Sequence, residues 1–358
     1  MNQPSRLNSA APPYHWRPWM VTSLAFLLAS GPLLANAPPD AAKEKPASPR
    51  HAGTRAKQAT AVPEFIRIVH DAKTKEPLRM ETATVTYTKR VKSRSGSKRK
   101  RLVTVDMIGA VHVGEATYYA ALNKQFEQYD ALLYELVAPK GVRPPKGSRA
   151  ASNNPAGFLQ NAMKQSLELE HQLEKIDYTK KNFVHADLSP EQMSAAMKKR
   201  GDNALTITLG VLADMIRQQN AAQARAAKDG KRQAAQDVDL ITLMLDPNGP
   251  TRMKRMMAQQ MVDMGPNGGV GQTLDQLLIQ DRNIAAMKVL ARQVAGGKRK
   301  LGVFYGAAHM PDFHRRLRKM GFRVKTTSWT PAWNLQIRKK SRNSELLQLL
   351  RLLQQLNR

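Results

Sequence analysis

The sequence predicts an α/β protein with a central mixed β-sheet and flanking helices, because one short pattern occurs twice in the same context. A Gly-x-x-His motif stands at 109–112 and again at 306–309. Each copy follows an apolar run typical of a buried strand and precedes a helix-like stretch and a second strand, so we describe a β-GxxH-α-β pseudo-repeat. Between the copies, residues 150–295 have mainly helical patterns and predict a helical insertion.

The strands of the expected sheet follow from the apolar runs. Residues 65–69 are expected as an edge strand, and the runs 82–88 and 102–108 predict a hairpin. Residues 131–137 are apolar on both faces, as in a central strand of a parallel sheet. The run 301–305 leads into the second motif, and the last strand is expected at 322–327, after a short basic helix with its N-cap at Pro311-Asp312.

Several helices have recognisable signals. Ser189-Pro190-Glu191-Gln192 has the form of a capping box with proline in the first turn. Another helix is expected over 273–295. Met253, Met257, Met261 and Met264 form a helical stripe, which favours core packing over an adaptable surface for a peptide.

The two ends of the chain are expected to lie outside the α/β domain, which we place at 63–336. Residues 1–37 have the pattern of a secretory signal peptide or an uncleaved membrane anchor, which predicts an exported protein, periplasmic or secreted. Residues 38–62 are expected to be a disordered linker. Residues 337–358 predict an amphipathic C-terminal helix that packs on the domain or on a second subunit.

Composition excludes some functions and suggests surroundings. The chain has no cysteine, which excludes disulfides, a thiol nucleophile and thiolate zinc sites. Its net charge of +29 suggests an anionic membrane or cell-wall surface nearby, whereas no motif for specific nucleic-acid binding occurs. The densest basic cluster, 89–101, lies between the two hairpin strands; we interpret it as a solvated tip, with anion binding as the alternative.

The two histidines and one carboxylate are the candidate chemical groups. A strand followed by Gly109 or Gly306 carries His112 or His309 to the carboxyl edge of the sheet, where open α/β sheets bind ligands. Glu135 interrupts an apolar strand, which is costly unless it is paired or metal-bound; the alternative is a strand end facing water. Two imidazoles and a carboxylate match a divalent-metal site (Zn, Mn or Co) that activates water, or a metal-free acid and base.

These motifs together resemble one family. Gly109-Ala110-Val111-His112, Tyr134-Glu135-Leu136, Asp281-Arg282-Asn283 and Gly306-Ala307-Ala308-His309 are similar, in this order, to the signature of the TraB/GumN family. That family includes the pheromone-shutdown proteins and the TIKI-type metalloproteases, and is distantly similar to erythromycin esterase. The resemblance covers residues 63–335. It implies an α/β domain with both histidines at one cleft and a divalent-metal-dependent hydrolytic activity in the TIKI-like branch.

The resemblance also implies roles for individual residues. His112, His309 and Glu135 would be metal ligands or direct catalytic groups, and Arg282 and Asn283 would orient them or hold an oxyanion. For Arg282 the alternative is a buried salt bridge to Asp281 or Glu135. His185 and Asp187 are weaker candidates, since Asp187 also fits a local turn.

The function expected from the sequence is an exported, divalent-metal-dependent hydrolase that acts on a peptide or amide bond. The alternative is a non-catalytic envelope protein that uses the same cleft to bind a metal or to bind and sequester a peptide. A third hypothesis, a polyanion-binding envelope protein, depends only on the positive charge.

Overall fold

The computed structural model describes most of the chain between residues 62 and 337. The described segments are 62–92, 100–148, 169–202, 248–263 and 275–337, with a few isolated positions between them. Within these segments, no helix has the length and apolar character needed to cross a membrane. The leader expected at 1–37, nearly all of the linker and nearly all of the C-terminal helix lie outside the described residues.

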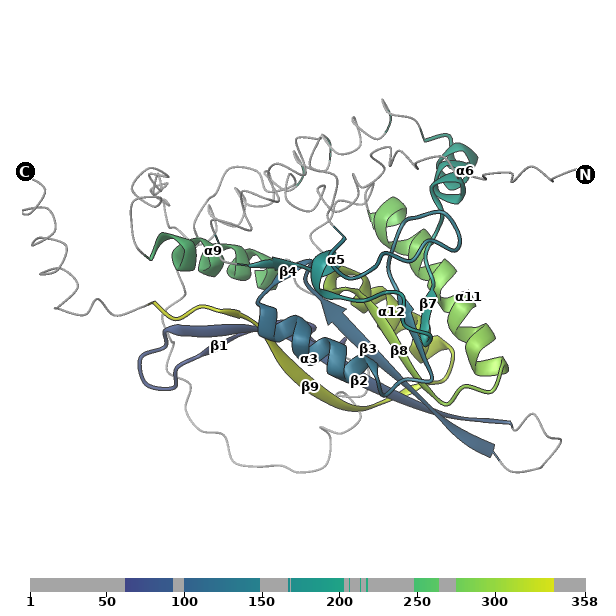
Figure 1. The fold of residues 1–358 in the computed structure, drawn as a ribbon, viewed down its shortest axis with the longest axis horizontal. Coiled ribbons are helices and arrows are strands. Elements are labelled where there is room, and N and C mark those ends of the chain that lie inside the picture. Colours follow the sequence, from purple (N-terminus) through teal and green to yellow (C-terminus); the bar gives the residue numbers. More distant parts are fainter. Residues whose placement is uncertain are drawn as a thin grey trace, which may run out of the picture.

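The centre of the fold is a mixed sheet (Figure 1). Its order is β1-β2-β3-β8-β5-β7, and β9 pairs with β2. β3, β8, β5 and β7 are parallel neighbours, whereas β2 pairs antiparallel with β1, β3 and β9. The bounds are β1 Ile66–His70, β2 Pro77–Lys92, β3 Lys100–Ala110, β5 Ala131–Tyr134, β7 Phe183–His185, β8 Lys300–Gly306 and β9 Arg323–Asn334.

The order of the strands brings distant parts of the sequence together. α3 (Ala116–Phe126) connects β3 to β5, but β8 lies between those two strands in the sheet. β3 and β8 pair in parallel from Thr104↔Lys300 to Ala110↔Gly306, so the two Gly-x-x-His motifs leave neighbouring strands at the same edge. This edge is the carboxyl end of the parallel strands.

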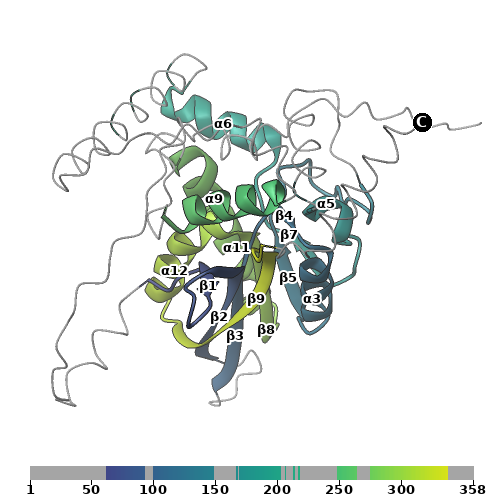
Figure 2. The ribbon, with the colours of Figure 1, turned by 90° about the vertical axis from the view of Figure 1, so that its left-hand side faces the viewer.

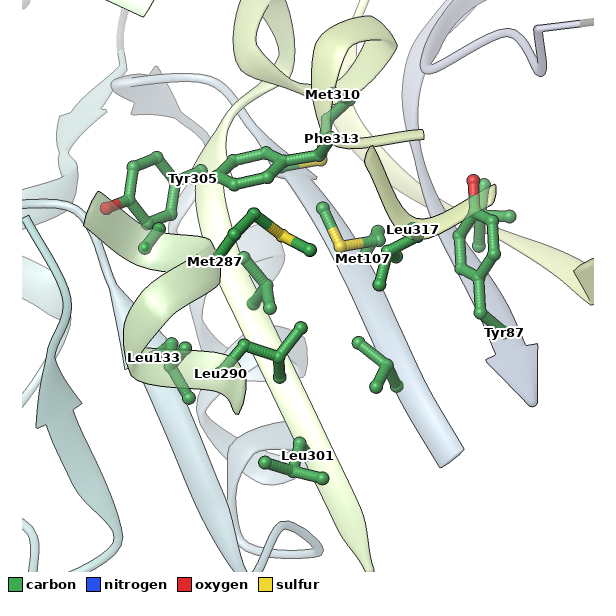
Figure 3. Packing of buried hydrophobic residues seen from close by; sticks show 14 of the residues in the cluster. Tyr87, Met107, Leu133, Met287, Leu290, Leu301, Tyr305, Met310, Phe313 and Leu317 are labelled. Atoms are coloured by element: carbon green, nitrogen blue, oxygen red, sulfur yellow. The ribbon is translucent and has the colours of Figure 1, made fainter. Parts of the chain in front are cut away.

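Helices cover both faces of the sheet, as the turned view shows (Figure 2). α3 packs on one face through Tyr118, Tyr119, Leu122 and Phe126. α11 (Asp281–Ala295) and α12 (Met310–Lys319) pack on the other face. There, Tyr305 of β8 contacts the ring of Phe313 of α12, and Met287 and Leu290 of α11 complete the layer (Figure 3).

The described parts of the middle region are mainly helical but include two short strands. The helical elements are α5 (Gln172–Lys175), α6 (Pro190–Arg200), α9 (Gly249–Asp263) and the π-helical turn η2 (Asp275–Gln280). β7 joins the main sheet, and β6 (Glu170–His171) pairs with β4 (Val113–Gly114). In α9, the side chains of Met253, Met257 and Met261 pack against the core on the α3 side; Met264 lies outside the described residues.

The mixed sheet with flanking helices that the sequence predicts is confirmed. The capping box at Ser189 and Gln192 is present as expected. Several boundaries differ. β2 begins at Pro77 rather than at 82, and β9 continues to Asn334 rather than ending at 327. The strand expected over 131–137 ends at Tyr134, and α12 begins at Met310, so Asp312 lies in its first turn and is not the N-cap. Proline is accepted inside a first helical turn because its missing N–H has no partner there, so the helix begins before Pro311.

Candidate active site

Side chains from four parallel strands meet at the carboxyl edge of the sheet. Glu135 follows β5 directly, and Asp187 comes two residues after β7. His309 follows β8 through the short 3-10 turn η3 (Ala307–His309), and His112 follows β3. Arg282 and Asn283 are buried at the N-terminal end of α11. The structure therefore brings the predicted residues of distant segments to one edge.

His309 is buried, and a chain of hydrogen bonds fixes its ring. Its Nδ1 lies 2.8 Å from Oδ1 of Asn283. The Asn283 amide donates from Nδ2 to the carbonyl of His309 (3.1 Å) and to Asp312 (2.9 Å), so its Oδ1 is the acceptor. Nδ1 of His309 must then carry a proton, which leaves Nε2 pointing toward Oε1 of Glu135 at 3.4 Å.

Glu135 is held as an ionised carboxylate. Its Oε1 accepts from Nη2 of Arg282, and its Oε2 accepts from the backbone N–H of Gly306, each at 2.7 Å. Burial alone would raise the pKa of Glu135, but the Arg282 guanidinium, with His309 and His112, holds the pKa well below its ordinary value of 4.5. Glu135 was expected inside a strand, but β5 ends at Tyr134, directly before it. Its side chain is nevertheless only 10% exposed.

Arg282 connects two carboxylates inside the protein. Its Nε and Nη2 donate to Asp187 at 3.0 and 2.6 Å, in addition to the bond with Glu135. Burial would lower the pKa of Arg282, but Asp187 and Glu135 raise it above its ordinary value. Asp281 is not its partner, since Asp281 pairs with Arg200. The predicted buried salt bridge to Glu135 is present, and Asp187, a weaker candidate, takes part in it.

Among the described residues, the buried cluster pairs two carboxylates, Glu135 and Asp187, with one guanidinium, that of Arg282. Nε2 of His309 faces Oε1 of Glu135 at 3.4 Å. A cation held between these two atoms would compensate the second carboxylate, because buried charge is tolerated only when it is paired.

Gly306 marks the point where the three predicted ligands converge. A Cβ added at this position would lie 3.4 Å from Oε2 of Glu135, 3.5 Å from Nε2 of His112 and 3.7 Å from Cδ2 of His309. The absence of a side chain at Gly306 therefore keeps this space open. Gly109, the glycine of the first motif, lies instead against the backbone of Ala83 and the side chain of Met310.

Of the three predicted ligands, His112 is the exposed one, and hydrogen bonds fix the backbone around it. Its carbonyl accepts from the N–H of Gln172 (2.9 Å), and the next carbonyl, of Val113, accepts from the indole of Trp333 (2.8 Å). The backbone N–H of Glu115 donates to Ala332 (3.0 Å). The loop is thus fixed by distant segments while the imidazole remains accessible to solvent.

The residues fit a divalent cation in donor type and in charge. The 3.4 Å between Nε2 of His309 and Oε1 of Glu135 is the separation expected of two ligands about 2.0–2.1 Å from one tetrahedral ion. In the described part of the chain, however, no group of three or more His, Asp or Glu side chains is placed to hold a metal ion as it stands. A third ligand would have to come from the exposed side chain of His112.

One predicted residue lies outside this network, and two contributors were not predicted from the sequence. His185 donates to the backbone carbonyl of Leu136 (2.6 Å), and its ring packs at a tilt against that of Tyr134, so it fixes the segment after Glu135. Asp312 orients Asn283, and the buried Tyr305 packs edge-on against His309 and donates to the carbonyl of Ala186. Their positions beside the second motif were the only sequence signal for them.

Comparison of the chain with protein-family models, with curated proteins and with solved structures found no match in any of the three.

Proposed function

We propose that this chain is an exported, divalent-metal-dependent hydrolase of the TraB/GumN type, which acts on a peptide or amide bond at the carboxyl edge of its sheet. The observation that carries the proposal is the facing pair of His309 and Glu135. Asn283 directs Nε2 of His309 toward a carboxylate that Arg282 keeps ionised, and this arrangement of donor atoms would suit a divalent cation.

The residues of the chain have distinct roles in this proposal. His309 and Glu135 would hold the cation from the buried side, and His112 would complete the set from the exposed side. When bound, the cation would lower the pKa of water and polarise the substrate carbonyl. If His112 is instead not a ligand, it would be the group best placed to exchange a proton with solvent, since the other members are buried.

Arg282 has a different role from the oxyanion binding considered for it. Its Nε and Nη2 are directed at Asp187 and Glu135. Its charge therefore keeps Glu135 ionised and holds both carboxylates in place, which preorganises the site before a substrate arrives. Asn283 acts in the same way on His309, by selecting the tautomer that presents Nε2.

The fixed carboxylate also favours a second candidate function. Both oxygens of Glu135 already accept hydrogen bonds, which suits a group that holds a cation more than one that must move to transfer a proton. The same edge would then bind a metal or a peptide without turnover. This alternative uses the same residues and differs only in the absence of a product.

Metal content and turnover, measured on the full chain, test both functions. The protein would be loaded with Zn, Mn or Co, dialysed and assayed for bound metal, then incubated with a peptide library. We expect about one metal per chain, with loss of metal and of turnover in His309→Ala and in His112→Ala. His70→Ala, which removes an exposed histidine from β1, is the matched control. Metal binding without turnover would support the binding protein, and full activity in either site variant would refute the mechanism.

A further inference from the structure

The β2–β3 hairpin carries a basic cluster that the candidate active site does not use. Residues 89–101 contain eight lysines and arginines and no acidic residue. In the described strands, β2 and β3 pair as far as Lys92↔Lys100, and this ribbon extends past the neighbouring strands (Figure 1).

The two faces of the ribbon use their cations differently. On the inner face, which continues the core layer of Tyr87 and Val103, Lys89 donates to the carbonyl of Met320 at the end of α12. Arg101 donates to the carbonyls of Val294 and Gly297 at the end of α11. These two cations satisfy helix C-termini, where positive charge is favoured, and are not available to a partner.

The outer face is exposed and has a different composition. Alternation along paired strands places Arg90, Lys92, Lys100 and Leu102 on this face, with Arg90 opposite Leu102 and Lys92 opposite Lys100. All four are exposed, and Leu102 is 50% exposed, the highest value among the large apolar side chains of the described residues. Arg323 of β9, paired with Thr88, adds a further exposed cation at the border.

Acidic groups near the outer face are already engaged. Asp106, four residues along the same face from Leu102, accepts from the hydroxyl of Tyr129. Asp130 accepts from the backbone N–H groups of Arg299 and Lys300. Among the described residues, the cations at the end of the ribbon therefore have no carboxylate between them on this face, and a complementary partner would be anionic.

We propose that the outer face of the β2–β3 hairpin, defined by Arg90, Lys92, Lys100 and Leu102, is a docking surface for an anionic lipid membrane. Cations around an exposed leucine suit the boundary between anionic headgroups and acyl chains, where the charges stay in water and the apolar side chain is buried. A nucleic-acid surface is less suitable, since the six positions from Thr88 to Lys92 and from Lys100 to Thr104 on this face include no aromatic side chain for stacking on bases.

Vesicle flotation of the full chain tests the proposal. The vesicles contain phosphatidylcholine alone, or phosphatidylcholine with phosphatidylglycerol at about 3:1. The measured quantity is the ratio of binding to the two vesicle types, because the N-terminal apolar stretch is identical in all variants and contributes equally to both. Thermal unfolding of each variant verifies that these exposed substitutions leave the fold intact.

We expect Arg90→Gln/Lys92→Gln/Lys100→Gln to lower binding to the phosphatidylglycerol vesicles on the order of 100-fold. Each cation at an anionic surface contributes about 1 kcal/mol, and 1.4 kcal/mol corresponds to tenfold. Leu102→Ser, at unchanged charge, is expected to lower binding about tenfold. The control Lys73→Gln/Lys288→Gln/Arg292→Gln removes three exposed cations from the β1–β2 turn and from α11, and should bind like the parent.

Three results would overturn the proposal. The first is binding of the hairpin variant at the level of the parent. The second is an equal loss of binding in the control variant, which would show that only total charge matters. The third is unchanged vesicle binding in Leu102→Ser together with loss of duplex DNA binding in the hairpin variant, which would assign the face to nucleic acid. Neither readout depends on hydrolytic activity.

Discussion

The two Gly-x-x-His segments have the same residue pattern and neighbouring positions in the sheet, but they fold differently. After Gly306, the chain turns into η3 and α12, and His309 is buried against Tyr305 and Asn283. After Gly109, the chain continues into β4, and His112 remains exposed. The residues that follow explain the difference, since Met310 and Pro311 begin a helix whereas Val113 and Gly114 pair with β6. The motif therefore places a histidine at the carboxyl edge of the sheet, and the residues that follow the motif determine whether this histidine is buried.

The stability of the protein should depend more on the buried cluster of Glu135, Asp187 and Arg282 than on a more exposed ion pair. Arg282→Met leaves Glu135 and Asp187 without their common cation, and we expect a loss of about 3–5 kcal/mol in the free energy of unfolding. Arg200→Met, which removes the more exposed pair with Asp281, should cost less than about 1 kcal/mol. Urea unfolding of both variants measures the difference. Equal losses would show that the buried cluster has no special role.

Lowering the pH should reduce the stability of the protein through Glu135, and Glu135→Gln should remove this contribution. Burial raises the pKa of Glu135, yet Arg282 and the histidines hold it well below 4.5, so its charge stabilises the fold above about pH 4.5. This stabilisation is lost as the pH falls through the depressed pKa. In Glu135→Gln, the cluster keeps one carboxylate and one guanidinium, and we expect a flatter decline of stability below pH 4.5. Denaturant unfolding as a function of pH is the measurement, and parallel curves for the two proteins would contradict the assignment.

Substituting the two histidines separately tests the comparison directly. His309→Ala removes a buried, hydrogen-bonded ring and should lower the free energy of unfolding by about 1–3 kcal/mol. His112→Ala removes an exposed ring and should change it by no more than about 0.5 kcal/mol. Both should abolish turnover under the proposed function. A destabilised His112→Ala protein would mean that the first motif is structural as well.

Substitutions of the motif glycines should have a small effect on stability and a selective effect on function. Gly109→Ala and Gly306→Ala both add a methyl group at ordinary contact distances, so each should change stability by less than about 1 kcal/mol. Only the methyl at Gly306 enters the space between Glu135, His112 and His309. We expect metal retention and turnover to fall in Gly306→Ala alone, as measured by elemental analysis and a peptide assay. A similar loss in Gly109→Ala would point to strand distortion as the cause.

The centre of the sheet could be predicted because β3, β5 and β8 contain apolar runs, and the runs of β3 and β8 lead into a glycine. The same reasoning placed His309 and Glu135 as candidates, since charged or imidazole groups beside buried strands need partners. Arg282 was a candidate only through the family resemblance. The sequence could not show that Asp187 shares Arg282 with Glu135, or that Asp312 orients Asn283. These contacts join residues 95 and 29 positions apart, and no local pattern encodes which distant partner a buried group will find.

The position of β8 in the sheet determines when the sheet can form during synthesis. β3 and β5 are synthesised early and are connected by α3, but the strand that lies between them begins only at Lys300. Until that strand leaves the ribosome, both neighbours lack their shared partner, and the early half of the chain cannot complete its sheet. At synthesis rates of about 5–20 residues per second, this interval lasts on the order of 10–30 seconds. We therefore expect the nascent chain to need protection from aggregation and proteolysis during that time, and a pause in translation before residue 300 to lengthen this period.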